Sequence, residues 1–203
     1  MVTHSKFDMV MSSRHLAPHR YKTFSSKLQY QMVLRAVCRL QESGFYWASI
    51  SGKEAGAMLA SQPSGTFLIR DSADQQHFFT LSVKTPSGTK NVRVQCDNYA
   101  FFLQTEPEGE RAAPRFDCML KLVTHYMFSK RDATARGNQR SAYYIYSGGE
   151  KVPLELLRPL LTTMASLKHL CRKTVNGHLD VSNKSEELPL SLKNYLEEYD
   201  ASI

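Results

Sequence analysis

One arginine at the end of an apolar run constrains the fold of this chain more than any other feature. Residues 67–72 have the sequence FLIRDS, in which Arg70 follows three large apolar residues that are typical of a buried strand. Burial of a guanidinium is costly unless an anion pairs with it, and its planar fork matches a carboxylate or a phosphate. The pattern leaves three alternatives for Arg70: extension from the strand end into solvent, pairing with an internal aspartate, or binding of an anionic ligand.

A second arginine follows on a predicted neighbouring strand. Residues 78–84 and 90–95 alternate as strands do, and the Pro-Ser-Gly turn at residues 86–88 joins them into a predicted hairpin. Arg93 occupies one of the polar positions of the second strand. Arg70 and Arg93 can therefore converge on one ligand.

Helices are predicted on either side of this sheet. Ser51 and Glu54 have the spacing of a capping box and predict a short helix just before the arginine strand. Residues 116–126 carry apolar side chains at helical spacing and predict a helix that covers the other sheet face, after which residues 142–146 return as a strand. We therefore expect an α+β fold with a central antiparallel sheet flanked by two helices.

Composition limits the other classes of protein. The chain has 203 residues and 42% hydrophobic content, enough for one domain of ordinary size and a smaller module. Its four cysteines lack a C-x-x-C pattern, and neither a signal peptide nor a membrane-spanning run is evident, which favours reduced thiols in a cytosolic protein. The net charge of +7 is spread along the chain, which argues against nucleic acid. The chain contains no catalytic or metal-binding motif that indicates an enzyme or a cofactor. The alternative of a tyrosine-kinase or phosphatase fragment is disfavoured, because the sequence has no catalytic-loop pattern.

A further helix is predicted before the sheet, after an aperiodic tail at residues 1–20. Ser26 and Gln29 form a predicted capping box at its start, and Gly44 marks its end. Phe24 precedes the cap, where a large apolar residue is either a hydrophobic staple or an exposed anchor. The pattern alone favours the staple. The apolar stripe of this helix consists of Tyr30, Val33, Leu34, Val37 and Leu40.

Two amphipathic helices are predicted near the C-terminus. In the first, Leu167, Cys171 and Val175 recur at spacing four, Leu170 widens the apolar face, and Gly177 is expected to end the helix. That face could pack on the chain's own domain or bind a partner. The second follows a predicted linker at residues 180–186 and is expected to have Ser191 as its N-cap.

Residues 44–47 and 65–72 resemble the Src-homology-2 (SH2) family, in which the arginine of the central strand binds phosphotyrosine. The resemblance implies that Arg70 binds the phosphate and that Ser72 and the amides of the following loop donate to it. It implies that Arg93 supports the phosphotyrosine ring or the phosphate. Ala73 stands where many members of the family have a second hydroxyl.

Residues 1–7, 22–27 and 41–47 are similar to the suppressor of cytokine signalling family. That resemblance implies a kinase inhibitory region at residues 21–32, which lies in the substrate groove of Janus kinases as a pseudosubstrate. Here Phe24 would be the anchor, and Tyr21 stands where the family has leucine. The implied inhibitory residues are Tyr21, Lys22, Thr23, Phe24, Ser25 and Ser26. Residues 28–43 would form the extended SH2 helix, and residues 44–156 the SH2 domain with a flexible insertion at residues 128–141.

The same resemblance implies an all-helical SOCS box at residues 157–203. In it Leu167, Leu170, Cys171 and Val175 would bind elongin C, together with elongin B. Leu188, Pro189 and Leu190 would bind a class-five cullin, although Ser191 stands where a second proline is usual.

The implied function is negative regulation of cytokine signalling through Janus kinases and STAT proteins. The protein would bind phosphotyrosine peptides of cytokine receptors, inhibit the kinase, and act as the substrate-recognition subunit of an elongin-cullin ubiquitin ligase. It would be cytoplasmic and recruited to the inner face of the plasma membrane by activated receptors. No cofactor, nucleic acid or membrane insertion is expected. The alternative is a phosphotyrosine adaptor without direct kinase inhibition.

Overall fold

The computed structural model describes residues 22–103, 113–128, 143–147, 149–182, 188–197 and 203. The predicted tail at residues 1–20, Tyr21 and nearly all of the predicted insertion at residues 128–141 lie outside the described residues. None of the described helices is long and apolar enough to cross a membrane.

A five-stranded sheet forms the centre of the molecule, in the order β4-β3-β2-β1-β7. Its four consecutive strands pair antiparallel, whereas β7 pairs parallel with β1. The strands are β1 (Thr66–Asp71), β2 (Phe79–Thr85), β3 (Gly88–Cys96), β4 (Phe101–Leu103) and β7 (Arg158–Pro159). A separate hairpin consists of β5 (Tyr144–Ser147) and β6 (Glu150–Pro153).

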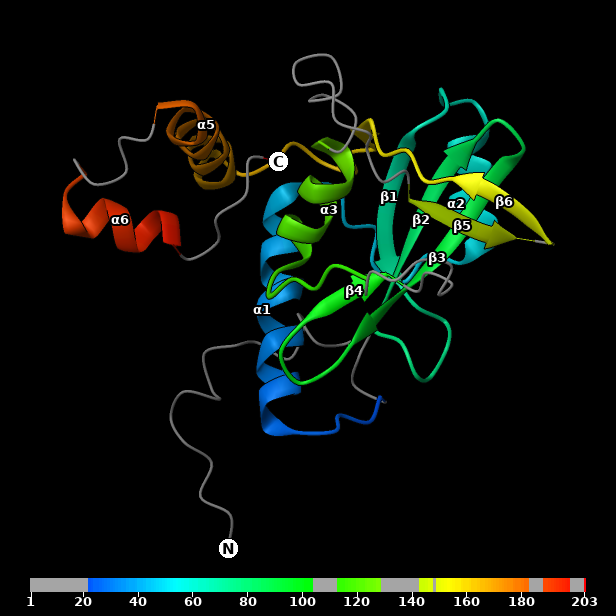
Figure 1. Cartoon of the computed structure of the whole chain (residues 1–203), viewed down its shortest axis with the longest axis horizontal. Coiled ribbons are helices and arrows are strands. Elements are labelled where there is room, and N and C mark those ends of the chain that lie inside the picture. The colour runs from blue at the N-terminus through cyan, green and yellow to red at the C-terminus, as the bar shows by residue number, and fades with distance from the viewer. Residues whose placement is uncertain (1–21, 104–112, 129–142, 148, 183–187, 198–202) are drawn as a thin grey trace, which may run out of the picture.

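Helices cover both faces of this sheet. Figure 1 shows α1 and α3 on one face and α2 behind the other, while α5 and α6 lie beyond α1, away from the sheet. The helices are α1 (Lys27–Ser43), α2 (Gly52–Ala60), α3 (Met119–Phe128), α5 (Leu167–Ser182) and α6 (Leu190–Glu197). The predicted α+β layering of a sheet between two helices, preceded by an extra helix, is therefore confirmed.

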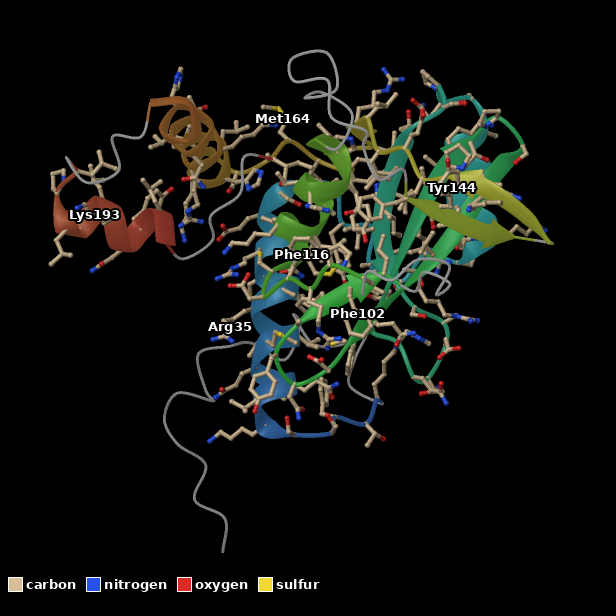
Figure 2. All side chains as sticks on the ribbon, viewed as in Figure 1. Arg35, Phe102, Phe116, Tyr144, Met164 and Lys193 are labelled. Atoms are coloured by element: carbon tan, nitrogen blue, oxygen red, sulfur yellow. The ribbon has the colours of Figure 1, made fainter. Side chains whose placement is uncertain are left out.

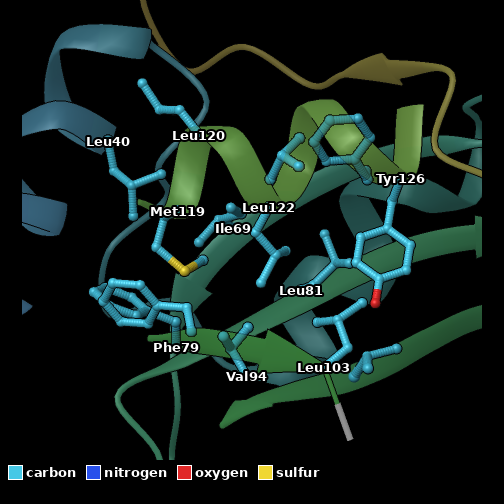
Figure 3. Packing of buried hydrophobic residues seen from close by; sticks show 14 of the residues in the cluster. Leu40, Ile69, Phe79, Leu81, Val94, Leu103, Met119, Leu120, Leu122 and Tyr126 are labelled. Carbon is cyan, nitrogen blue, oxygen red and sulfur yellow. The ribbon is translucent and has the colours of Figure 1, made fainter. Parts of the chain in front are cut away.

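The main hydrophobic core lies between the sheet and the pair α1 and α3 (Figure 3). Leu40 of α1 and Met119 and Leu122 of α3 pack there against Ile69 and Leu81 of the strands. On the opposite face a smaller cluster joins Ala55 and Leu59 of α2 to Leu68. Successive residues of β1 alternate between these two clusters, so β1 is buried on both sides, including Arg70 and Asp71 at its end.

Local signals define the helix ends as expected in two places. Ser51 and Glu54 form the predicted capping box of α2. Gly44 ends α1 with a φ of 80°, and a Cβ atom there would lie 2.7 Å from the carbonyl oxygen of Thr163. Only glycine tolerates both this left-handed conformation and the close contact with the backbone of Thr163. Gly44 therefore allows the end of α1 to pack against the segment that leads to α5.

Three expectations for the C-terminal part were wrong. Gly177 does not end its helix, because it lacks the left-handed conformation of Gly44 and α5 continues to Ser182. Ser191 is not the N-cap of α6, since the carbonyl of Pro189 already accepts from Leu192 and Lys193. The segment assigned to an all-helical SOCS box from residue 157 begins with β7, which extends the sheet of the SH2 domain.

Candidate phosphate-binding site

Three polar residues stand directly opposite one another across the middle of the sheet. Arg70 on β1 pairs with Thr80 on β2, and Thr80 pairs with Arg93 on β3. Directly opposed residues of antiparallel strands project from the same face. Arg70 and Arg93 therefore project from the face that α2 partly covers, with Thr80 between them. A shared face is what binding of one ligand by both arginines requires.

The guanidinium of Arg70 is fixed by three neutral oxygen atoms. Its Nε donates to Ser82 Oγ at 3.2 Å, one Nη donates to Asn91 Oδ1 at 3.2 Å, and the other donates to the Asp71 carbonyl at 3.0 Å. Ser82 in turn donates to Asn91 Oδ1 at 2.7 Å. Arg70 is only 6% exposed, and burial lowers the pKa of its guanidinium. This excludes extension of the side chain into solvent.

The carboxylate of Asp71 is hydrogen-bonded to Tyr46. The Tyr46 hydroxyl donates this short hydrogen bond, and both side chains are buried. Burial raises the pKa of Asp71, opposed by the Tyr46 hydrogen bond and by the charges of Lys22 and Arg70. The neighbouring aspartate thus ties β1 to the segment before α2.

The loop after Ser72 offers hydrogen-bond donors to an anion. Four of its amides are used internally: those of Ser72, Asp74, Gln76 and His77. The amides of Ala73 and Gln75 make no hydrogen bond within the described part of the chain. Backbone N–H groups exposed by a turn can bind an anion.

Asp74 connects this loop to Arg93. Its carboxylate lies 3.5 Å from Arg93 Nε and 2.9 Å from His77 Nδ1. The hydrogen bonds from His77 and from the Gln76 amide, with the charge of Arg93, lower the pKa of Asp74. Arg93 is 55% exposed, so its guanidinium is accessible to an anion from solvent.

The start of α2 lies beside the same guanidinium. A Cβ atom at Gly52 would stand 3.2 Å from Arg70 Nη2, so a side chain at this position would crowd the arginine. The positive end of the helix dipole adds to the charge of the site.

Sequence reasoning missed Thr80, Ser82, Asn91 and Gly52, although it found Arg70, Ser72 and Arg93. The signal for Thr80, Ser82 and Asn91 was the register of the predicted hairpin, because a pairing of Thr80 with Arg93 also places Ser82 opposite Asn91. Among the described residues, no group of histidine, cysteine and carboxylate side chains could hold a metal ion.

The segment before α1 lies against the loop of this site. Lys22 Nζ donates to the carbonyls of Ser72, Asp74 and His77. The ring of Phe24 stacks on Phe78 at 4.9 Å between centroids and meets Tyr30 edge-on at 5.1 Å. Tyr30 is in the first turn of α1, so Phe24 has the packing of a staple. The structure thus supports the staple alternative for the free protein, and Thr23 is exposed.

Ser25 and Ser26 share the capping of α1. Ser26 Oγ accepts from the Gln29 amide at 3.1 Å, as predicted. Gln29 Oε1 accepts a hydrogen bond from the amide of Ser25 rather than from that of Ser26. The second hydrogen bond of the capping box is therefore shifted by one residue. Ser26 also donates to Asn98 Oδ1 at 2.6 Å, which ties the helix start to the turn after β3.

The C-terminal helix α5 has two different faces. His169, Arg172 and Asn176 are buried. Leu167 is 77% exposed, Leu170 43% and Val175 36%, and Cys171 is exposed with a free thiol. The four predicted elongin-binding residues therefore form one accessible apolar stripe. Of the predicted cullin-binding residues, Leu190 is 72% exposed, Pro189 is exposed and Leu188 is half-buried.

Comparison with protein families agrees with both regions. The SH2 domain family matches residues 45–126, and the SOCS box family matches residues 163–197. The protein is therefore an SH2 domain followed by a SOCS box. It is 54% identical to suppressor of cytokine signaling 3 of Gallus gallus and 52% identical to that of Homo sapiens, each over 100% of both chains. Suppressor of cytokine signaling 2 of Homo sapiens is 34% identical over 84% of this chain and 82% of its own.

The chain belongs to the suppressor of cytokine signaling family. Membership in this family defines a regulator and adaptor rather than an enzyme.

Proposed function

We propose that this protein suppresses cytokine signalling by binding phosphotyrosine on activated cytokine receptors. The observation that carries this proposal is the convergence of Arg70, Arg93 and the loop after Ser72 on one face of the sheet. A phosphate dianion can pair with both guanidiniums and accept from the free amides. The protein would act in the cytoplasm and be recruited by activated receptors to the inner face of the plasma membrane.

Titration calorimetry tests this binding directly. The full chain is titrated with a tyrosine-phosphorylated cytokine-receptor peptide and with the same peptide unphosphorylated. We expect saturable binding of the first and at least a hundredfold weaker binding of the second, since about 3 kcal/mol is expected from charge-assisted hydrogen bonds to a phosphate. Equal binding of the two peptides would contradict the proposal.

The second part of the proposal is inhibition of a receptor-bound Janus kinase by residues 21–32. The supporting features are the family resemblance, the aromatic Phe24 and the exposed Thr23, whose hydroxyl is not a substrate of a tyrosine kinase. Phe24 cannot stack on Phe78 and fill a kinase pocket at the same time. Inhibition therefore requires this ring to leave Phe78.

Two aromatic variants separate these roles. Phe24→Ala is expected to weaken inhibition of an isolated Janus kinase domain about thirtyfold, because an aromatic anchor in a pocket contributes about 2 kcal/mol or more. Phe78→Leu removes the stacking partner and keeps Phe24, so inhibition should be retained. Inhibition curves measure both effects, and the melting temperature of each variant is the control. Equal losses in the two variants would show that Phe24 acts through the internal stack.

A phosphotyrosine adaptor without direct kinase inhibition is the second candidate. The internal packing of Phe24 on Phe78 and Tyr30 favours it, since that packing gives the residue a structural role without any kinase. In this case the purified wild-type chain would leave the isolated kinase fully active.

The third part of the proposal is recruitment of a ubiquitin ligase. The exposed apolar stripe of α5 would bind elongin C in its complex with elongin B, and residues 188–190 would bind a class-five cullin. The receptor or the kinase held by the SH2 domain would then be the substrate for ubiquitin transfer, which is carried out by the ligase.

A further inference from the structure

The ammonium group of Lys22 lies against the backbone of the loop at residues 72–77. Its Nζ is 2.7 Å from the Ser72 carbonyl and 3.1 Å from the Asp74 carbonyl, and it also donates to the carbonyl of His77. Ser72, Asp74 and His77 are separated from Lys22 by 50 residues or more in the sequence. A single cation thus gathers three carbonyl oxygens of one short loop.

Two of these carbonyls belong to peptide units whose N–H groups are available. The Ser72 carbonyl shares its peptide unit with the amide of Ala73, and the Asp74 carbonyl shares its unit with that of Gln75. These two amides make no hydrogen bond within the described residues. A planar trans peptide unit directs its N–H group opposite to its carbonyl. Lys22 therefore turns both amides to the side away from itself.

Charge strengthens this arrangement. A cation bound at a carbonyl oxygen polarises the peptide unit and makes its N–H group a better donor. Burial lowers the pKa of Lys22, whereas Asp71 and Asp74 oppose this shift and favour the charged form. The adjacent stack of Phe24 on Phe78 holds the segment at the loop.

We propose that Lys22 is a positioning residue for phosphotyrosine: it holds the loop of residues 72–77 so that the amides of Ala73 and Gln75 donate to the phosphate. This inference rests on the proposed phosphotyrosine binding and assigns Lys22 a role distinct from kinase inhibition. The residue would act through the loop and would not touch the ligand.

The test compares Lys22→Met with Lys121→Met in the full chain. Both changes remove one positive charge and keep a long apolar side chain, but Lys121 lies on α3 across the opposite face of the sheet and pairs with Asp117. With the tyrosine-phosphorylated receptor peptide, calorimetry should show about tenfold weaker binding for Lys22→Met, as expected for loss of a charge-assisted contact. Lys121→Met should stay within twofold of wild type. Lys22→Arg, which keeps a charged donor, should recover most of the affinity.

Amide NMR spectra without ligand provide the second readout. The resonances of Ala73 and Gln75 should move in Lys22→Met and stay in place in Lys121→Met. Failure of the wild-type chain to prefer the phosphorylated peptide would contradict the proposed function, and the spectra would still test the loop. Unchanged resonances, or an affinity of Lys22→Met within twofold of wild type, would overturn the inference. Equal losses in Lys22→Met and Lys22→Arg would overturn it as well.

Discussion

At the scale of single residues, Arg70 is held in place before any ligand arrives. Its three acceptors are neutral oxygens, and the Asp71 carboxylate is engaged by Tyr46. The orientation of the guanidinium is therefore fixed by neutral acceptors, and no carboxylate hydrogen-bonds to it within the described residues. Such preorganisation reduces the entropy lost on binding.

Arg70→Lys should reduce affinity for the phosphorylated peptide by at least tenfold. An ammonium group cannot reproduce the bonds to Ser82 and Asn91 and bind a phosphate in bidentate geometry at the same time, and a charge-assisted contact contributes about 1.5 to 3 kcal/mol. Calorimetry measures this loss. Arg35→Lys, on the exposed side of α1, is the matched control and should bind as wild type does. An affinity of Arg70→Lys within threefold of wild type would contradict the assigned role.

At the scale of secondary-structure elements, the start of α1 depends on one hydroxyl. Ser26 caps the helix and also donates to Asn98. The hydroxyl of the adjacent, exposed Ser25 donates to Asn98 Oδ1 at 3.1 Å but does not cap the helix. The two serines therefore separate capping from the contact with the turn.

Ser26→Ala should lower the free energy of unfolding by about 1 kcal/mol, the usual contribution of an N-cap. Ser25→Ala should change it by less than about 0.5 kcal/mol, as expected for an exposed site. Urea unfolding at constant pH measures both values. Equal effects of the two substitutions would show that the contact with Asn98, rather than the cap, stabilises the helix.

The exposed stripe of α5 makes a second prediction at this scale. Leu167→Asp combined with Cys171→Arg should abolish copurification with elongins B and C, because both side chains are exposed and charge is costly at an apolar interface. Phosphopeptide affinity should remain at the wild-type value. The matched control is Lys173→Ala on an exposed position of the same helix. Normal copurification of the double variant would assign the stripe no role in elongin binding.

At the scale of the whole molecule, α1 joins the SH2 domain to the C-terminal helices. Figure 2 shows Lys193 at one side of the molecule, Tyr144 at the other, and Met164 between them. The backbone carbonyl of Glu42 in α1 accepts a hydrogen bond from the Ser166 amide. The Glu42 carboxylate lies 3.7 Å from Lys168 Nζ and 3.9 Å from Arg172 Nη1. Arg172 is fully buried and also packs over the ring of Tyr195 of α6.

His169 makes this junction sensitive to acid. It is 2% exposed, and burial, with the charges of Lys173 and Arg172, lowers its pKa to about 4 from an ordinary value of 6.5. Above pH 6.5 the histidine is neutral in both the folded and the unfolded chain. Between pH 6.5 and about 4 only the unfolded chain binds the proton, so stability decreases as the pH falls through this interval.

Urea unfolding at pH 7.5 and pH 5 measures this effect. The stability lost by wild type between the two values should be smaller in His169→Gln, which cannot be protonated. His178→Gln is the control, because His178 is exposed on the same helix. An identical pH dependence of wild type and His169→Gln would exclude this histidine as the cause.

The sequence by itself determined the features that depend on near neighbours in the chain. The capping box of α2 and the hairpin at residues 78–95 join residues that are near one another in the chain, and both formed as predicted. The stripe of α1 was predicted in part: Val33, Val37 and Leu40 are buried, whereas Tyr30 and Leu34 are half-buried and Met32 and Ala36 complete the buried face. Arg70 was found because a guanidinium at the end of an apolar strand needs an anionic partner, and Arg93 because the predicted hairpin places it on a neighbouring strand. Local patterns failed at Gly177 and Ser191, where a residue compatible with a helix end stands inside a helix.

Only the tertiary structure decided how distant segments share one site. The contacts of Lys22 with the loop at residues 72–77 and the stack of Phe24 on Phe78 cross 50 residues or more, and nothing in either segment specifies the other. The same holds for β7, which pairs with β1 from within the segment assigned to the SOCS box, and for Glu42 with Arg172. Such pairs depend on how the closed core places chain segments in space. Local sequence periodicity does not encode that placement.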